Sequence, residues 1–319
     1  MTRITLAVAC LSILLAAPPA MAEHKVLAVS LDGCRPDALQ IANTPHVDAL
    51  IAAGAFSFDA RNVLDYGDSG PNYSSMLTGV NWPKHGVTDN SFAGSHFDLW
   101  PHMFKRIEAL DPGAMYTAQF CGWGPINAGT EADHYADQVG ASSDSGNAAA
   151  IVTLLQAGDP DVIFWQISAP DSAGHTNGFS PTVPGYIAAI EQADTLYGDV
   201  LDALYGRPGY IDGSEEWLIL TVTDHGGHGT SHHLPDASLT DAERLEIQKT
   251  FYVATGPGVG VGADLGQPRV YDVAVTALEY MGVATQGLDL DGRVVMPEPA
   301  TLGLLALGGL GLLLRRSRT

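Results

Sequence analysis

Positive charge is scarce in this sequence. Its 319 residues include 15 Lys and Arg against 36 Asp and Glu, which gives a formal net charge of −21 at pH 7. Because such a chain repels phosphate on average, it is a poor candidate for non-specific binding to nucleic acid or to an anionic membrane. An anionic substrate would need local cations to reverse this field at its binding site.

Cysteine is also rare, with three residues in the whole chain. Two of them, Cys34 and Cys121, lie in the part of the chain expected to fold. In an oxidising compartment they could form a disulfide, and two buried free thiols are an equal alternative. Neither has the spacing to another cysteine that a metal site requires. Apolar residues, by contrast, make up 46% of the chain, which is enough for a core and excludes disorder as the main state.

The N-terminal segment, residues 1–22, has the pattern of a secretory signal. A positive charge at Arg3 precedes an apolar run over residues 4–17, and the segment ends with Ala20-Met21-Ala22, an A-x-A cleavage pattern. The alternative is an N-terminal membrane helix, which needs about 20 apolar residues and is therefore longer than this run. We expect an exported protein, either periplasmic or on the cell surface.

The C-terminal segment, residues 297–319, carries a second signal. Pro297-Glu298-Pro299 is followed by an apolar, Gly-rich stretch over residues 302–314 and by a cluster of arginines. This order resembles the bacterial PEP-CTERM sorting signal. The resemblance implies a transient membrane anchor that an exosortase-type processing enzyme removes, and a permanent tail anchor is the alternative. Residues 23–296 remain as one expected catalytic domain.

Short apolar stretches alternate with amphipathic ones along this domain. The short stretches are apolar at both odd and even positions, which is typical of strands buried on both faces. Strands are expected at residues 25–31, 114–119, 162–167, 217–222 and 250–254, and helices at residues 46–53, 147–156, 183–205 and 270–281. The pattern predicts an α/β fold with a mostly parallel central sheet and helices on both faces.

Acidic and imidazole side chains follow three of the expected strands. Asp32 comes directly after the first, Asp171 and His175 come after residues 162–167, and Asp224 and His225 come after residues 217–222. Functional groups of open α/β sheets lie beyond the carboxyl ends of the strands. Each segment alone has a structural explanation as a cap or a turn, but together they predict one site.

Two further segments complete this prediction. Ser69 and Asn72 lie on a Gly-Pro turn before a short helical run, where a hydroxyl and an amide can face an anion. The expected strand at residues 217–222 is followed by a loop rich in histidine and glycine, which contains His228, His232 and His233. Carboxylate and imidazole ligands suit zinc and also accept manganese or iron. Two such ions would activate a serine hydroxyl and clamp a tetrahedral anion.

These motifs resemble the alkaline phosphatase superfamily, nearest to its type I phosphodiesterase and nucleotide pyrophosphatase branch. The resemblance rests on motifs in the same order as in that family, namely Leu31-Asp32-Gly33, Ser69-Gly70-Pro71-Asn72, residues 81–90, Pro170-Asp171 with Gly174-His175, and Thr223-Asp224-His225-Gly226. It implies an alkaline phosphatase-like three-layer sandwich and two divalent ions, zinc or alternatively manganese.

The resemblance also implies a role for each residue. One ion would be held by Asp32, Asp224 and His225 and would contact the nucleophile Ser69. The other would be held by Asp171, His175 and a third histidine. His232 is favoured as that ligand over His228 and His233, because similar short members carry a histidine a few residues after the sequence DHGGHG. Ser69 would form a covalent phosphoserine, Asn72 would bind a phosphoryl oxygen, and His85 and Asn90 would belong to the scaffold.

The same comparison bears on the substrate, which we expect to be a small phosphate ester. Sulfatases of the superfamily need a Cys or Ser in C/S-x-P-x-R, and Tyr73 stands here at the Arg position. The sequence offers no obvious cation for a second phosphate charge, although Arg35, Arg61 and Lys84 are candidates, so a diester or a permissive phosphatase is favoured. Four aromatic residues could stack on a leaving group or belong to the core: Tyr66, Tyr73, Trp82 and Trp123.

Two alternatives stay open at this stage. A phosphonate or sulfate-ester hydrolase of the same superfamily would use the same residues. A non-catalytic surface or biofilm protein with a vestigial metal site would need to have lost some ligands, and the first five are all present.

Overall fold

The computed structural model describes residues 22–296. The expected signal segment, apart from Ala22, and the expected PEP-CTERM segment lie outside these residues. No helix within residues 22–296 combines the length and the apolar character needed to cross a membrane.

A seven-stranded sheet runs through the centre of the molecule in the order β2-β7-β6-β1-β5-β3-β4. Its strands are β1 (Glu23–Leu31), β2 (Ala55–Arg61), β3 (Thr117–Cys121), β4 (Gln138–Ala141), β5 (Val162–Ile167), β6 (Glu215–Val222) and β7 (Lys249–Thr255). The five strands from β6 to β4 are parallel, and β7 runs antiparallel to both β6 and β2. The expected α/β fold with a mostly parallel sheet is therefore confirmed.

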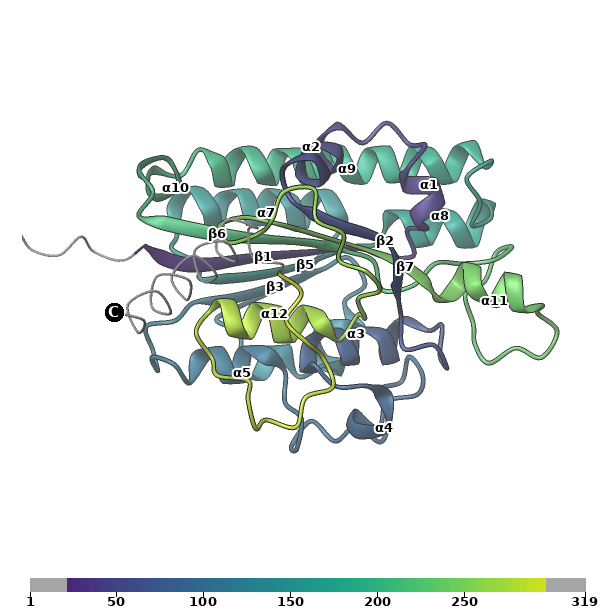
Figure 1. Cartoon of the computed structure of the whole chain (residues 1–319), viewed down its shortest axis with the longest axis horizontal. Helices are drawn as coiled ribbons and strands as arrows, with labels where there is room; N and C mark the ends of the chain where they lie inside the picture. The colour runs from purple at the N-terminus through teal and green to yellow at the C-terminus, as the bar shows by residue number, and fades with distance from the viewer. Residues whose placement is uncertain (1–21, 297–319) are drawn as a thin grey trace, which may run out of the picture.

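Helices cover both faces of this sheet, as Figure 1 shows for α2, α7 and α9 on one side and α3, α5 and α12 on the other. The helices are α1 (Pro36–Leu39), α2 (Pro45–Ala53), α3 (Ser69–Thr78), α4 (Trp82–His85), α5 (Met103–Glu108), α6 (Pro125–Gly129), α7 (Asp144–Ala157), α8 (Ala169–Asn177), α9 (Pro184–Tyr205), α10 (Pro208–Asp212), α11 (Asp241–Gln248) and α12 (Asp272–Tyr280), with a short 3₁₀ turn at Ala132–His134.

The packing of β1 explains why residues 26–29 are apolar at four successive positions. Leu27, Val29 and Leu31 pack into the core on the α9 side, whereas Val26 and Ala28 pack into the core on the α12 side. All five side chains are fully buried. Since each face of the strand carries its own core, residues 26–29 do not alternate between apolar and polar.

The five strands and four helices expected from the sequence are all present, with small shifts at their ends. The expectation missed β2 and β4. Both are edge strands with partly exposed residues, so neither forms the continuous apolar run that marks the inner strands. It also missed most of the short helices near the site, including α1, α4 and α8.

Both cysteines are buried and unbonded in the structure. Of the two alternatives that the sequence left open, the structure shows the free thiols. Burial also raises the pKa of the thiol of Cys34 and that of Cys121.

Candidate active site

The carboxyl ends of three neighbouring strands bring the acidic residues together. In the order β6, β1, β5, the strands end next to one another and are followed by Asp224, Asp32 and Asp171. The turn after β1 is tight, because Gly33 has φ +63° and a Cβ at this position would lie 2.9 Å from Asp171 Oδ1. Glycine at 33 therefore allows Asp32 and Asp171 to approach each other.

Helix α8 supplies Asp171 and His175 from one face, because the two residues are four positions apart. The helix starts where the Ser168 and Ala169 amides donate hydrogen bonds to the Asp144 carboxylate, over 2.9 and 2.8 Å. Asp144 thus caps α8 from another element and fixes its direction toward the site. His175 Nε2 lies 3.5 Å from Asp171 Oδ2.

The loop after β6 supplies His225 and His232, whose rings stack with their centroids 3.8 Å apart. His225 Nδ1 donates to the Gly226 carbonyl over 2.7 Å, and His232 Nδ1 donates to the Gly67 carbonyl over 2.9 Å. Because a carbonyl can only accept, both rings carry their proton on Nδ1, and each Nε2 presents a lone pair to the site.

Helix α3 begins at Ser69, and its hydroxyl lies 3.2 Å from His225 Nε2. The same nitrogen lies 3.4 Å from Asp32 Oδ1 and 3.3 Å from Asp224 Oδ2. The expected nucleophile and one expected set of metal ligands therefore converge on a single point.

A second group forms beside the first. Asp171, His175 and His232 each offer one ligand atom within 4.8 Å of the others, and so do Asp32, Asp171 and His225. Asp171 belongs to both groups and lies between them. Of the three candidate histidines, the structure brings His232 to the site. His228 instead pairs with Glu243 and Glu246 on α11, and His233 pairs with Asp68.

Unpaired polar atoms show that these residues fit a cation. Seven buried side-chain polar atoms of the described residues lack a hydrogen-bond partner, and three of them are Asp32 Oδ1, Asp171 Oδ1 and Asp224 Oδ2. Buried polar groups are normally paired, so a concentration of carboxylate oxygens without donors marks a place for positive charge. The donor set of carboxylates and unprotonated imidazoles suits a divalent metal such as zinc.

The pKa shifts of these side chains agree with this interpretation. Burial, together with the charges of Asp224 and Asp171, raises the pKa of Asp32 well above its ordinary value. Burial raises the pKa of Asp224 to about 8 and that of Asp171 to about 6. Burial also lowers the pKa of His225, and it lowers the pKa of His232 to about 4. Without a cation the carboxylates tend to hold protons and the imidazoles stay neutral.

A cavity of about 350 Å³ opens onto the two groups. Besides the acidic and imidazole residues it is lined by Ser69, Asn90, Gly122, Trp123, Gln166, Ser168 and Ser172. None of its lining residues is Lys or Arg. The three cations considered from the sequence are engaged with carboxylates elsewhere: Arg35 with Asp37 and Glu246, Arg61 with Asp59, and Lys84 with Asp289 and Asp291.

The structure corrects the expected position of Asn72. Its side chain is fully buried; its Oδ1 accepts from the Val63 amide, and its Nδ2 donates to the Tyr66 and Asp68 carbonyls. All of these partners are backbone groups of the turn before α3, so Asn72 braces that turn and does not line the cavity. Asn90, which was expected to be scaffold, lines the cavity instead, and its Oδ1 accepts from the Gly70 amide over 2.7 Å.

Of the four aromatic residues considered, only Trp123 lines the cavity. The Tyr73 hydroxyl is buried and donates to Asp32 Oδ2, and Tyr66 packs edge-on against Trp82. Sequence reasoning missed Gln166 as a site residue. Gln166 is the one polar residue of the otherwise apolar strand β5, and this exception was the signal that could have identified it.

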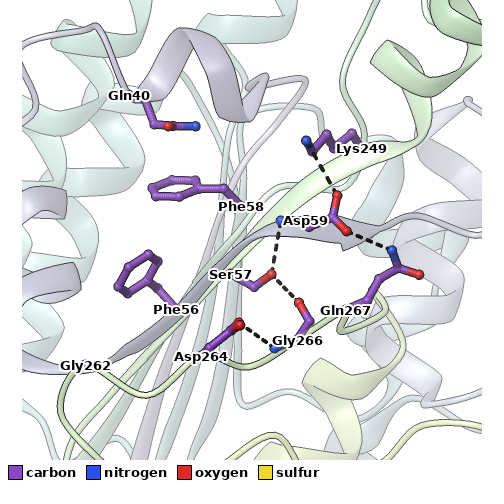
Figure 2. A pocket seen from close by; sticks show the side chains of 10 residues that line it. All are labelled: Gln40, Phe56, Ser57, Phe58, Asp59, Lys249, Gly262, Asp264, Gly266 and Gln267. Atoms are coloured by element: carbon purple, nitrogen blue, oxygen red, sulfur yellow. Dashed lines mark hydrogen bonds and ion pairs between the residues drawn. The ribbon is translucent and has the colours of Figure 1, made fainter.

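A wider cavity of about 880 Å³ lies elsewhere, beside the edge strand β2 (Figure 2). Its charged side chains pair with their neighbours, Asp59 lying 3.5 Å from Lys249 Nζ and accepting a hydrogen bond from Gln267 over 2.9 Å. Its lining includes no His or Cys, so its size does not make it the better candidate for catalysis.

Comparisons with known proteins agree with the motifs. A family model described as type I phosphodiesterase / nucleotide pyrophosphatase matches residues 26–101. Mouse (Mus musculus) ectonucleotide pyrophosphatase/phosphodiesterase family member 3 is 25% identical over 235 residues, which cover 67% of this chain and 26% of that protein. Bis(5'-adenosyl)-triphosphatase ENPP4 from Bos taurus is 28% identical over 234 residues, which cover 66% of this chain and 48% of that protein. The chain thus spans less than half of the curated relatives it matches first.

Solved structures share the fold. A 2-O GAG sulfatase superposes with a TM-score of 0.67 at 12% identity, covering 86% of this chain and 73% of that one. Murine ectonucleotide pyrophosphatase/phosphodiesterase 5, as an inactive variant in complex with AMP, superposes with a TM-score of 0.63 at 16% identity, covering 82% and 96%. The expected alkaline phosphatase-like fold is confirmed. The family model and the curated relatives thus match part of the chain, and the solved structures share its fold.

Proposed function

We propose that this chain is an exported, metal-dependent hydrolase of phosphodiesters that uses Ser69 as its nucleophile. The observation that carries the proposal is the position of the Ser69 hydroxyl, 3.2 Å from a lone pair of His225 and beside carboxylate oxygens that lack donors. Export rests on the N-terminal signal pattern.

Two divalent cations held by the acidic and imidazole groups would supply positive charge beside the Ser69 hydroxyl and the phosphoryl oxygens. Ser69 Oγ forms a bond to phosphorus while the bond between phosphorus and the first ester oxygen breaks. The Ser69 hydroxyl gives its proton to water, and the departing alcohol takes a proton from water. Water then cleaves the phosphoserine bond, which frees Ser69 and releases the phosphomonoester product.

Asn90 is placed to bind the phosphoryl group. Because its Oδ1 accepts from the Gly70 amide, its NH₂ group is the end that can donate toward the cavity. Such a donor stabilises the charge that develops on phosphoryl oxygens during attack. Trp123 offers the cavity an apolar ring that can contact the ester group.

The charge of the cavity favours a diester over a monoester. A phosphodiester carries one negative charge, and a phosphomonoester carries close to two at neutral pH. The lining residues include no Lys or Arg to offset the second charge. Two divalent cations held there would bring four positive charges against the three carboxylates, so a substrate with a single negative charge would fit the site better.

A sulfate ester also carries one negative charge, so it is the second candidate substrate. Position 73 holds Tyr in place of the Arg of the sulfatase motif, and its hydroxyl is used by Asp32. This observation favours a serine that remains unmodified, and with it phosphorus esters.

The deciding experiment is a substrate panel on the purified protein with Zn²⁺ or Mn²⁺. The panel contains bis-p-nitrophenyl phosphate, p-nitrophenyl phosphate, p-nitrophenyl sulfate and a phosphonate monoester. We expect the first to be cleaved fastest and Ser69→Ala to abolish its cleavage. Cleavage of none of the four, with both metals bound, would leave the surface-protein alternative as the better account.

A further inference from the structure

Gln166 connects the metal-binding residues with the wall of the substrate cavity. It lies near the carboxyl end of β5, its side chain is fully buried, and it lines the cavity. Its Nε2 donates to Asp32 Oδ2 over 2.6 Å, and its Oε1 accepts from the Trp123 amide over 2.9 Å. One side chain thus touches two parts of the site that come from different strands.

The partners of Gln166 also fix the orientation of its amide. If the amide were rotated by half a turn, its oxygen would face the Asp32 carboxylate and its NH₂ group would face the Trp123 N–H. Both contacts would then be repulsive. Ser168 Oγ lies 3.1 Å from Nε2 and 3.3 Å from Oε1 and is compatible with the observed orientation.

The contact with Asp32 determines which carboxylate oxygen is available to a cation. Oδ2 receives two donors, the Gln166 amide and the Tyr73 hydroxyl at 3.1 Å. Oδ1 is buried, has no hydrogen-bond partner, and lies 3.4 Å from His225 Nε2. The two donors hold the carboxylate so that Oδ1 faces the metal-binding group, which is how outer-shell partners orient ligands.

The contact with Trp123 fixes the turn after β3. Gln166 binds two successive amides of this turn, Gly122 N through its main-chain carbonyl at 3.1 Å and Trp123 N through its side chain. The Trp123 ring in turn stacks on Phe92, with 6.1 Å between the ring centroids. Without the side chain of Gln166, the Trp123 amide would lose its partner and the ring its fixed position.

We infer that Gln166 is a positioning residue that sets Asp32 for metal binding and Trp123 for substrate binding at the same time. Tyr73 shares the first task and not the second, because within residues 22–296 its hydroxyl bonds to Asp32 and Ser30 only. This difference separates the two roles. The substrate half of the inference rests on the proposed function, and the metal half does not.

The metal half is tested without substrate. Zn²⁺ affinity is measured by competition with a fluorescent chelator for the wild type, Gln166→Met, Tyr73→Phe and Gln119→Met. Gln119 is the matched control, since it is a fully buried glutamine on the adjacent strand β3 that bonds to His102 and Asn127, away from the carboxylates. We expect Q166M and Y73F to weaken Zn²⁺ binding about ten- to hundredfold, and Q119M to leave it within about twofold.

The substrate half is tested by kinetics at saturating Zn²⁺ with bis-p-nitrophenyl phosphate. We expect Q166M to raise KM about tenfold or more because Trp123 is displaced, while Y73F keeps the KM of the wild type. If Q166M is insoluble, Gln166→Asn replaces it, because its shorter amide must lose at least one of the two bonds and therefore shows at least one of the two defects.

Three results would overturn the inference. They are unchanged Zn²⁺ affinity in Q166M, equal KM in Q166M and the wild type, and defects in Q119M as large as those in Q166M. If the wild type cleaves no ester, the proposed function fails, and the chelator competition still decides whether Gln166 positions Asp32.

Discussion

The Nε2 atoms of His175 and His232 lie 3.1 Å apart, with a lone pair on each. His175 Nδ1 donates to the Thr230 carbonyl and His232 Nδ1 donates to the Gly67 carbonyl, so neither Nε2 carries a proton in the neutral ring. Two lone pairs at hydrogen-bond distance repel unless a cation lies between them. Asp171 Oδ1, 3.5 Å from His232 Nε2, adds negative charge at the same point.

Metal removal should therefore destabilise the protein. Dialysis against a chelator leaves these groups without a cation, and adding Zn²⁺ at about 100 times its dissociation constant should raise the free energy of unfolding by about 2.7 kcal/mol per site. Thermal unfolding with and without Zn²⁺ measures this. His175→Ala should lose part of the Zn²⁺-dependent gain. His134→Ala is the control, because its ring is 63% exposed beside Glu131 and Asp133 and should leave the gain unchanged.

The metal-free protein should lose stability as the pH rises from about 6.5 to about 8. Burial raises the pKa of Asp224 to about 8 from an ordinary value of 3.8, so the native state keeps a proton that the unfolded state has lost. The stabilisation is complete at low pH and disappears as the pH passes the native pKa, with a slope of up to about 1.4 kcal/mol per pH unit for each such proton. The lowered pKa values of His225 and His232 affect the free energy of unfolding only below about pH 6.5, because there the imidazoles of the unfolded chain become protonated.

Urea unfolding in chelator at several pH values checks this slope. Asp224→Asn should flatten it, because the amide does not titrate, and the same variant should lose Zn²⁺ binding. An unfolding free energy of the metal-free wild type that rises between pH 6.5 and 8 would contradict the burial of a protonated carboxyl at this position.

Ser69→Ala should reduce diester hydrolysis by a factor on the order of 10⁴ or more, because no other hydroxyl takes the place of a lost nucleophile. Its metal content should stay close to that of the wild type, since carboxylates and imidazoles supply the other ligands. Ser69→Thr should keep measurable activity because it retains the hydroxyl. The control is Ser74→Ala on the same helix, whose buried hydroxyl has no partner among the described residues. Equal loss in both alanine variants would point to a damaged helix.

The sequence predicted that the acidic residues of the candidate site lie together, because each follows an apolar strand and strand ends in a parallel sheet meet at one edge. Asp32, Asp171 and Asp224 come from the neighbouring strands β1, β5 and β6, so the pattern of the chain and the geometry of the sheet agree. The edge strands β2 and β4 gave no such signal, because some of their residues face solvent and the sequence there is not continuously apolar.

The roles of Asn72 and Asn90 show what local sequence does not determine. Asn72 lies three residues after the nucleophile, but its side chain is directed away from the cavity. Its oxygen and its NH₂ group form hydrogen bonds with backbone groups of the turn before α3. Asn90 reaches the site only because the chain after α4 returns to the start of α3. This return is visible at Gly70, where a Cβ would lie 2.4 Å from the Asp89 carbonyl oxygen.

Substitution should separate these two asparagines. Asn90→Ala should lower kcat/KM for a diester about 10²-fold, because it removes one donor to the phosphoryl group. Its loss of stability should be smaller than that of Asn72→Ala, because the exposed Asn90 side chain pairs with one backbone amide, that of Gly70. Asn72→Ala should instead lower the free energy of unfolding by about 1–3 kcal/mol for each buried backbone group left unpaired. Kinetics and chemical denaturation on both variants measure the difference. A catalytic defect in N72A at full stability would restore the expectation from the sequence.

The preference for a diester should follow from the charge of the cavity. The wild type should have a higher kcat/KM for bis-p-nitrophenyl phosphate than for p-nitrophenyl phosphate, and Ser172→Lys should shift that ratio toward the monoester by about tenfold, equivalent to about 1.4 kcal/mol. Ser172 lines the cavity, so a lysine there adds a positive charge that can pair with the second negative charge of a phosphomonoester.

The control is Thr195→Lys on α9, at an exposed position outside the cavity lining. It adds the same charge and should leave the ratio unchanged. Metal content is measured in parallel, because a lysine beside Asp171 that displaced a cation would lower both rates together. A wild type that prefers the monoester would mean that the bound cations alone balance two charges, and the argument for a diester would fail.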